Sequence, residues 1–361
     1  MKKKCRFVGI MFLCIIIVCT VLVMIYERAT NNNTKENENF TVVTSFYPMY
    51  IAALNIVDGA DGVTLENLSE PQTGCLHDFQ LTPEDMKLLS TADMFVINGG
   101  GIESFMSDVA KAYPDLTVVE ACKNVELINE SEEDVDTHDH DNEADSDETD
   151  HDHDNEADSD ETDHDHDNEA DSDETDHDHE TDSDESGHDH DHGDENAHAW
   201  MSVARYRVMV STIAESLSKA DPSNAAIYDS NAKKYDAKLA ELEEKENEIK
   251  QKTAGNDIII FHEASEYVAD DFGMNVCYLM DLDEERAVSA GEVSDVINAV
   301  RNDGVSVILA EELYGKDLGD TVSRETDVKM VYIDPLNRGN YDKNSYIEGM
   351  EKNFELIEAA F

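Results

Sequence analysis

The sequence is short of basic residues. It contains 26 lysine and arginine residues against 84 aspartate and glutamate residues, and its formal net charge at pH 7 is −58. A protein that binds nucleic-acid phosphates needs a basic face to neutralise them. The composition therefore excludes a nucleic-acid partner.

Cysteine pairs are also absent. Three of the six cysteines lie within the first 19 residues, and the other three, Cys75, Cys122 and Cys277, are widely spaced. No C-x-x-C pair occurs, which argues against a zinc site built on thiolates, and the spacing does not form a disulfide framework. Histidine is distributed unevenly instead, because eleven of the fourteen histidines fall in one stretch.

That stretch, residues 130–196, has 35 acidic residues, no lysine or arginine and almost no apolar side chain. It cannot bury enough surface to offset the entropy of ordering, so we expect a disordered loop. Neutral imidazole binds metals, and the neighbouring carboxylates attract divalent cations. We therefore predict a secondary, low-affinity metal site here; the alternative is a solvating acidic linker. The histidines of this tract are His138, His140, His151, His153, His164, His166, His177, His179, His188, His190 and His192.

The N-terminus carries an export signal. Four basic residues within Lys2–Arg6 precede an apolar run from Phe7 to Tyr26. A basic segment before an apolar run marks export, and a run of about 20 residues is long enough to span a bilayer. Basic residues stay on the cytoplasmic side, so the rest of the chain is predicted to lie outside the membrane. Residues 1–39 would then be an anchor and tether, with a cleaved signal or a lipid on Cys19 as the alternatives.

The rest of the chain alternates apolar runs with helical stretches, a pattern typical of parallel sheets covered on both faces. It predicts an N-terminal lobe over residues 40–129 that is completed by residues 197–223 after the acidic loop. Residues 224–253 contain no glycine or proline, which indicates a linking helix over 224–254 of order 45 Å in length. A second lobe follows over residues 255–361. The predicted fold is therefore α/β, with two lobes of mostly parallel sheet joined by one long rigid helix.

Four residues in predicted loops are candidate metal ligands. His262 and Asp334 each follow an apolar strand directly, and ligands in open α/β sheets bind beyond the carboxyl ends of strands. His77 lies in the loop after another strand, and His198 lies at the turn into a helix. Three imidazoles and one carboxylate would fill a tetrahedral zinc shell, whereas manganese prefers more oxygen ligands.

Four separated motifs resemble the zinc and manganese solute-binding proteins of bacterial ABC importers. They are GCLHDFQLTPED from Gly74, AHAWMS from Ala197, FHEASEYV from Phe261 and YIDPLN from Tyr332. The resemblance implies two α/β lobes bridged by a stiff helix, with His77, His198, His262 and Asp334 as ligands of Zn²⁺, or less readily of Mn²⁺. It also implies a monomeric receptor on the outer face of the cell membrane. The receptor would deliver metal to an ABC permease and its cytoplasmic ATPase.

Several alternatives stay open at this point. Glu312 or a water molecule competes with Asp334 as the fourth ligand, because Glu311 and Glu312 follow another strand and only one of them can face the cleft. A metal-buffering or adhesive surface protein would make the histidine tract the active part. A zinc hydrolase is disfavoured, because Glu266 stands where an H-E-x-x-H motif needs its second histidine.

Overall fold

The computed structural model describes residues 39–69, 79–129, 195–280, 282 and 287–361. Residues 1–38 of the predicted anchor and tether, His77, and residues 130–194 of the histidine tract lie outside the described residues. Both sheets described below belong to one compact unit. No helix within the described ranges is long and apolar enough to cross a membrane.

The N-terminal lobe contains a parallel sheet of four strands in the order β2-β1-β3-β4. Its strands are β1 (Phe40–Thr44), β2 (Val63–Asn67), β3 (Met94–Ile97) and β4 (Thr117–Glu120). The helices between them are α2 (Tyr47–Ile56), α3 (Pro83–Leu89) and α4 (Met106–Ala112). All four residues of β3 are buried, as expected for a central strand covered on both faces.

The C-terminal lobe repeats this architecture with a second parallel sheet in the order β10-β9-β7-β8. Its strands are β7 (Asp257–Ile260), β8 (Asn275–Leu279), β9 (Val307–Ala310) and β10 (Lys329–Tyr332). Its helices are α7 (Ala264–Phe272), α8 (Ala290–Asp303), α9 (Glu312–Glu325) and α10 (Ser345–Ala360). The predicted α/β fold with mostly parallel sheets is confirmed.

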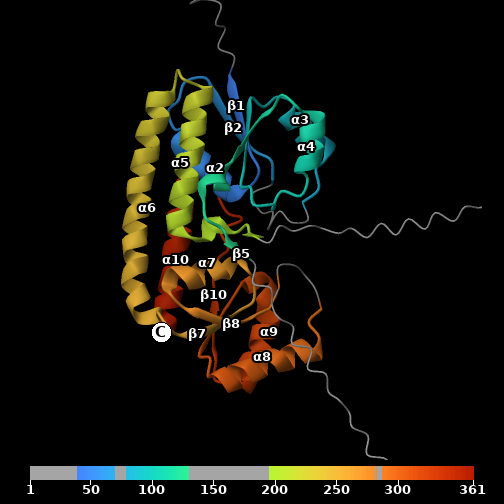
Figure 1. Cartoon of the computed structure of the whole chain (residues 1–361), viewed down its shortest axis with the longest axis vertical. Helices are drawn as coiled ribbons and strands as arrows, with labels where there is room; N and C mark the ends of the chain where they lie inside the picture. The colour runs from blue at the N-terminus through green and yellow to red at the C-terminus, as the bar shows by residue number, and fades with distance from the viewer. Residues whose placement is uncertain (1–38, 70–78, 130–194, 281, 283–286) are drawn as a thin grey trace, which may run out of the picture. The chain divides into compact units, whose positions relative to one another are not determined.

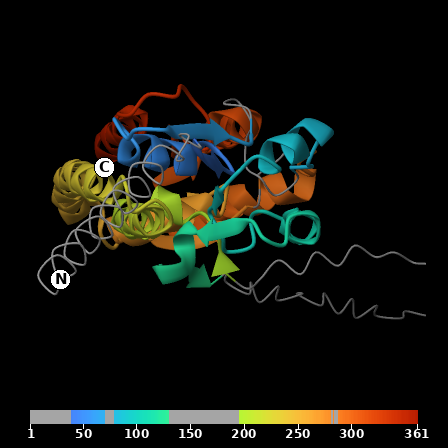
Figure 2. The same cartoon turned by 90° about the horizontal axis from the view of Figure 1, so that it is seen from above.

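The second of two long helices connects the lobes. Helix α5 (Val203–Ala220) leads into α6 (Ala225–Thr253), and the two lie side by side in Figures 1 and 2. Buried positions of α6 repeat every seven residues, a spacing typical of coiled-coil packing. One series is Tyr228, Tyr235, Leu242 and Ile249, and the other is Leu239, Glu246 and Thr253. Lys245 and Lys252 of α6 form ion pairs with Glu351 and Glu358 of α10, again seven residues apart.

The segments before and after the histidines of the tract form a short antiparallel ladder. Strand β5 (Ile128–Asn129) pairs with β6 (Glu195–Asn196), so Asn129 lies opposite Glu195. The predicted loop over residues 130–196 is therefore too long by two residues at its C-terminal end. Strand β6 leads directly to His198.

Candidate metal centre

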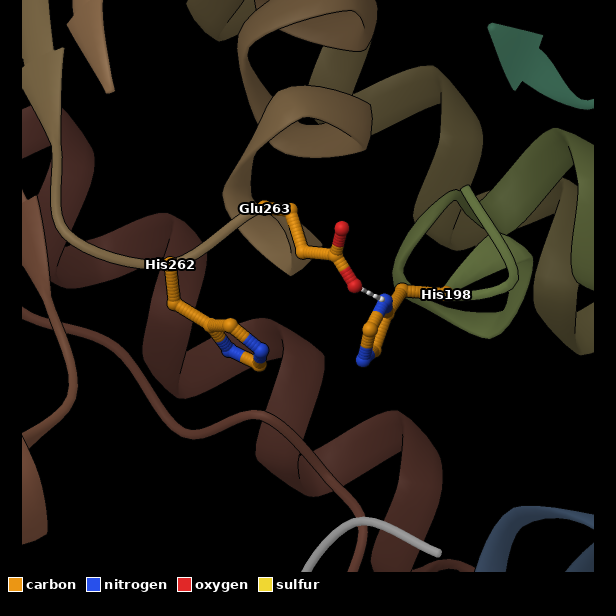
Figure 3. A group of neighbouring side chains, drawn as sticks. All are labelled: His198, His262 and Glu263. Atoms are coloured by element: carbon orange, nitrogen blue, oxygen red, sulfur yellow. Dashed lines mark ion pairs between the residues drawn. The ribbon is translucent and has the colours of Figure 1, made fainter. Parts of the chain in front are cut away.

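Two of the predicted ligands, His198 and His262, meet in the interior of the protein. His198 lies between β6 and the short 3-10 helix η2 (Ala199–Met201), and His262 follows β7. The two residues are 0% and 1% exposed. The ring centroids are 4.9 Å apart and the ring planes make an angle of 78° (Figure 3). Two segments that are far apart in the sequence thus bring their imidazoles together.

Glu263 completes a group of three possible ligands. It precedes α7, and one of its carboxylate oxygens lies 3.1 Å from Nδ1 of His198 (Figure 3). One donor atom from each of Glu263, His198 and His262 lies within 4.8 Å of the other two. Such a group of imidazole nitrogens and carboxylate oxygen has the chemistry of a zinc or manganese site.

Each imidazole faces a carboxylate through its Nδ1 atom. Oε1 of Glu311 lies 2.7 Å from Nδ1 of His262, and both side chains are buried. Nδ1 of His198 faces Oε1 of Glu263 at 3.1 Å and Oδ1 of Asn196 at 3.0 Å. An acceptor beside Nδ1 favours the tautomer with the proton on that atom, which leaves the lone pair of Nε2 for a metal. This arrangement orients both rings before a metal binds.

Asn196 fixes the positions of His198 and Glu263 relative to each other. Its Oδ1 accepts a hydrogen bond from the backbone N–H of His198 at 3.0 Å. Its Nδ2 donates to the backbone oxygen of Glu263 at 2.9 Å and to Oε2 of Glu266 at 2.8 Å. The hydroxyl of Tyr267 donates to the backbone oxygen of Asn196 at 2.6 Å. The last residue of β6 therefore belongs to the support of the metal centre.

Asp334 follows β10 by two residues and is exposed, and it is not part of the three-residue group found among the described residues. Pro335, the residue after Asp334, is however hydrogen-bonded to the segment that contains His198. Nε1 of Trp200 donates to the backbone oxygen of Pro335 at 2.8 Å, and the Trp200 ring lies 4.9 Å from that of His198. Asp334 thus starts a turn that is held beside the centre.

The remaining candidates have different positions. His77 lies outside the described residues. Glu312 is the first residue of α9, its side chain is 73% exposed, and it pairs with Lys316 at 3.4 Å. Its neighbour Glu311 faces His262, so the carboxylate that reaches the centre from this pair is Glu311. The two residues do not continue β9, because α9 begins at Glu312.

Loss of the Glu311 charge is expected to weaken metal binding. Glu311→Gln keeps a hydrogen-bond acceptor beside His262 but removes the charge that makes the imidazole a better ligand. Changes in such supporting residues typically weaken metal affinity by about 10- to 100-fold. The measurement is competition for Zn²⁺ with a chelator. Glu312→Gln is the matched control and should leave affinity unchanged; equal effects of the two variants would contradict the role of Glu311.

Comparison with known proteins identifies a matching family. Residues 42–360 match the model of the ZnuA family, described as zinc-uptake complex component A, periplasmic. The chain is 28% identical over 331 residues to zinc-binding protein AdcA of Streptococcus pyogenes, covering 88% of this chain and 55% of that protein. It is 25% identical over 352 residues to the high-affinity zinc uptake system protein ZnuA of Bacillus subtilis, covering 95% of each.

A solved structure shows the same fold. The solute-binding protein FpvC of Pseudomonas aeruginosa, solved in complex with Ni²⁺, superposes with a TM-score of 0.65 at 21% identity. The alignment covers 89% of this chain and 96% of FpvC. The chain spans about half the length of the AdcA relatives, at 55%, so similarity to them extends over only part of those proteins. The resemblance drawn from the four motifs is confirmed: the chain belongs to the ZnuA family of periplasmic zinc-uptake components.

Proposed function

We propose that this protein captures Zn²⁺ outside the cytoplasmic membrane and delivers it to an ABC importer. The observation that carries the proposal is the buried pair His198 and His262, each with its Nδ1 against a carboxylate. Membership of the ZnuA family supports the direction of transport, which is uptake. The partners are then a membrane permease and its cytoplasmic ATPase.

The proposed ligands are His77, His198, His262 and Asp334. Three neutral imidazoles and one carboxylate suit tetrahedral Zn²⁺ at metal–ligand distances of roughly 2.0–2.2 Å. Glu263 then acts as the acceptor that orients His198, in the way that Glu311 orients His262. Mn²⁺ is the less favoured cargo, because it prefers more oxygen ligands than this set provides.

A closed shell of four protein ligands suits capture and release of the metal. Catalytic zinc sites keep one position open for water or substrate, and four protein ligands leave no such position. The chemistry of this ligand set therefore supports a binding protein, and it does not supply the activated water that a zinc hydrolase needs.

The attachment of the protein to the cell is proposed from the sequence. The apolar run Phe7–Tyr26 would hold the chain on the outer face of the cell membrane, with Cys19 as the site of a lipid if the signal is cleaved. A single centre that one chain completes needs no second copy, so we propose a monomer. Partition of the protein into membranes before and after a Cys19→Ser change would separate the two kinds of anchor.

Deletion of Thr137–Gly193 tests whether the centre works without the histidine tract. The β5–β6 ladder pairs Asn129 with Glu195, which flank the deleted segment, so the shortened connection can close without disturbing His198. We expect one tightly bound Zn²⁺ per molecule to remain and only weaker, multiple binding to be lost, because preorganised ligands bind more tightly than ligands that must be ordered. Elemental analysis and chelator competition give the stoichiometry and the affinity. Loss of the tight site would favour the metal-buffering function instead.

A further inference from the structure

A buried amide holds the backbone of Asp334 on both sides. The N–H of Asp334 donates to Oδ1 of Asn353 at 2.8 Å, and Nδ2 of Asn353 donates to the backbone oxygen of Asp334 at 2.8 Å. Asn353 lies in α10 and is 2% exposed. Both hydrogen-bonding groups of one backbone residue are thus fixed by one side chain on a neighbouring helix.

The turn that follows Asp334 is strained. Leu336 has a φ of 53° and is the only non-glycine residue of the described chain with a positive φ. Its backbone N–H donates to Oδ1 of Asp334 at 2.9 Å. A branched-chain aliphatic residue adopts this left-handed conformation only where its surroundings enforce it, and such strain is concentrated at functional sites.

Helix α10 also leaves the space that this turn needs. The side chain of Leu336 packs over Gly349, where a Cβ atom would collide with Cδ2 of Leu336. Gly349 lies one helical turn before Asn353, so both residues are on the same face of α10. Trp200 also holds the carbonyl of Pro335, and the hydroxyl of Tyr346 in α10 donates to the backbone oxygen of Trp200 at 2.8 Å.

We propose that the Gly349–Asn353 face of α10 positions Asp334 as a metal ligand. Asn353 is the positioning residue, since it fixes the backbone from which the carboxylate projects, and Gly349 accommodates the strained turn. The inference rests on the proposed function, in which Asp334 binds the metal together with His198. A carboxylate held at a fixed distance from the imidazoles binds more tightly than one that must be ordered by the metal.

A double-mutant cycle in zinc affinity tests this role. The full chain is compared with Asn353→Ala, Asp334→Ala and the double variant by chelator competition with Zn²⁺. We expect Asn353→Ala to raise the Kd about tenfold, as for other residues that support metal ligands. If Asn353 acts through Asp334, the same change in the Asp334→Ala background should alter the Kd by less than about twofold, because residues that act together are not additive.

Asn224 provides the matched control. It is 6% exposed, and its amide holds the backbone of Asp61 through the same two hydrogen bonds, at 3.2 Å and 3.0 Å. Asn224→Ala should therefore lower thermal stability as Asn353→Ala does, yet leave zinc affinity unchanged.

The outcomes of the cycle distinguish the positioning role of Asn353 from the ligand role of Asp334. Equal losses of affinity from Asn353→Ala in both backgrounds, or a loss from Asn224→Ala as large as that from Asn353→Ala, would overturn the positioning role while leaving Asp334 as a ligand. An unchanged Kd for Asp334→Ala would overturn both.

Discussion

Replacing His262 by alanine is expected to abolish most of the stabilisation that zinc gives to the protein. A ligand that binds only the folded state, present at a thousand times its Kd, raises the free energy of unfolding by about 4 kcal/mol. Loss of a buried ligand worth about 4 kcal/mol would raise the Kd about a thousandfold. At the same zinc concentration the stabilisation would then fall below about 0.5 kcal/mol.

The zinc-free protein will also change, so the quantity to measure is the difference in unfolding free energy with and without zinc. Glu311 is 4% exposed and loses its partner when His262 is removed. A buried acceptor without a partner lowers stability by about 1–3 kcal/mol. Urea unfolding of each variant in both conditions separates this loss from the loss of binding.

Thr253→Ala is a suitable control for the His262→Ala experiment. Thr253 is fully buried and its hydroxyl donates to the backbone oxygen of Phe272 at 2.8 Å, away from the centre. This variant should lose stability in both conditions and keep the full zinc gain. A full zinc gain in His262→Ala would show that His262 is a packing residue and not a ligand.

The position of His262 could be predicted because it depends on local features. A short apolar run followed by a single histidine places that side chain beyond the carboxyl end of a strand, where open α/β sheets bind ligands. Strand β7 and His262 fulfil this expectation. His198 carried a weaker local signal, and the ABC-importer resemblance was needed to place it beside His262.

The role of Glu311 could not be predicted from the pattern around it. Helix α9 is hard to predict from its sequence, because Gly315 and Gly319 lower its helix propensity. Both glycines are there for tertiary reasons. A Cβ on Gly315 would lie 2.9 Å from that of Ala310, and one on Gly319 would lie 2.6 Å from the hydroxyl oxygen of Tyr332. The inward direction of Glu311 follows from the start of α9 at Glu312. It cannot be predicted unless that helix is predicted first.

The positioning of Asp334 could not be predicted from the sequence either, for a different reason. Its place at the end of an apolar strand is visible in the sequence, but its fixation depends on Asn353, which is 19 residues away. The positive φ of Leu336 is equally invisible, since leucine does not favour that conformation. Sequence patterns of this kind indicate which residues can bind a metal, while long-range packing decides which of them are held in place to do so.

Glu246 occupies a position in the buried seam of α6 that coiled-coil packing normally gives to an apolar residue. It is 5% exposed, and its Oε2 has no hydrogen-bond partner among the described residues. Burial, followed by the negative charges of Asp271 and Glu243, raises the pKa of Glu246 from 4.5 to about 8. Lys250 and Arg205 oppose this increase.

The raised pKa predicts that the protein loses stability as the pH rises. Between pH 4.5 and about pH 8 the folded chain keeps the proton of Glu246, whereas the unfolded chain releases it. The contribution of Glu246 is therefore complete below pH 4.5, decreases up to about pH 8 and is constant above it. Asp271 adds to the same trend, because burial raises its pKa from 3.8 to about 6.

Glu246→Gln should remove the part of this pH dependence that Glu246 contributes and leave the part that Asp271 contributes. Protonated glutamate and glutamine are neutral and nearly the same size, so the two proteins should unfold with equal free energy near pH 4. At pH 8 the variant should be more stable by several kcal/mol, at most about 4, since one pKa unit corresponds to about 1.4 kcal/mol.

Urea unfolding of the zinc-free proteins across this range gives the difference, and the pH dependence of the metal centre cancels between them. Glu244→Gln, at an exposed position of the same helix, should follow the wild-type curve. Parallel curves for wild type and Glu246→Gln would mean that Glu246 has the same pKa in the folded and the unfolded chain.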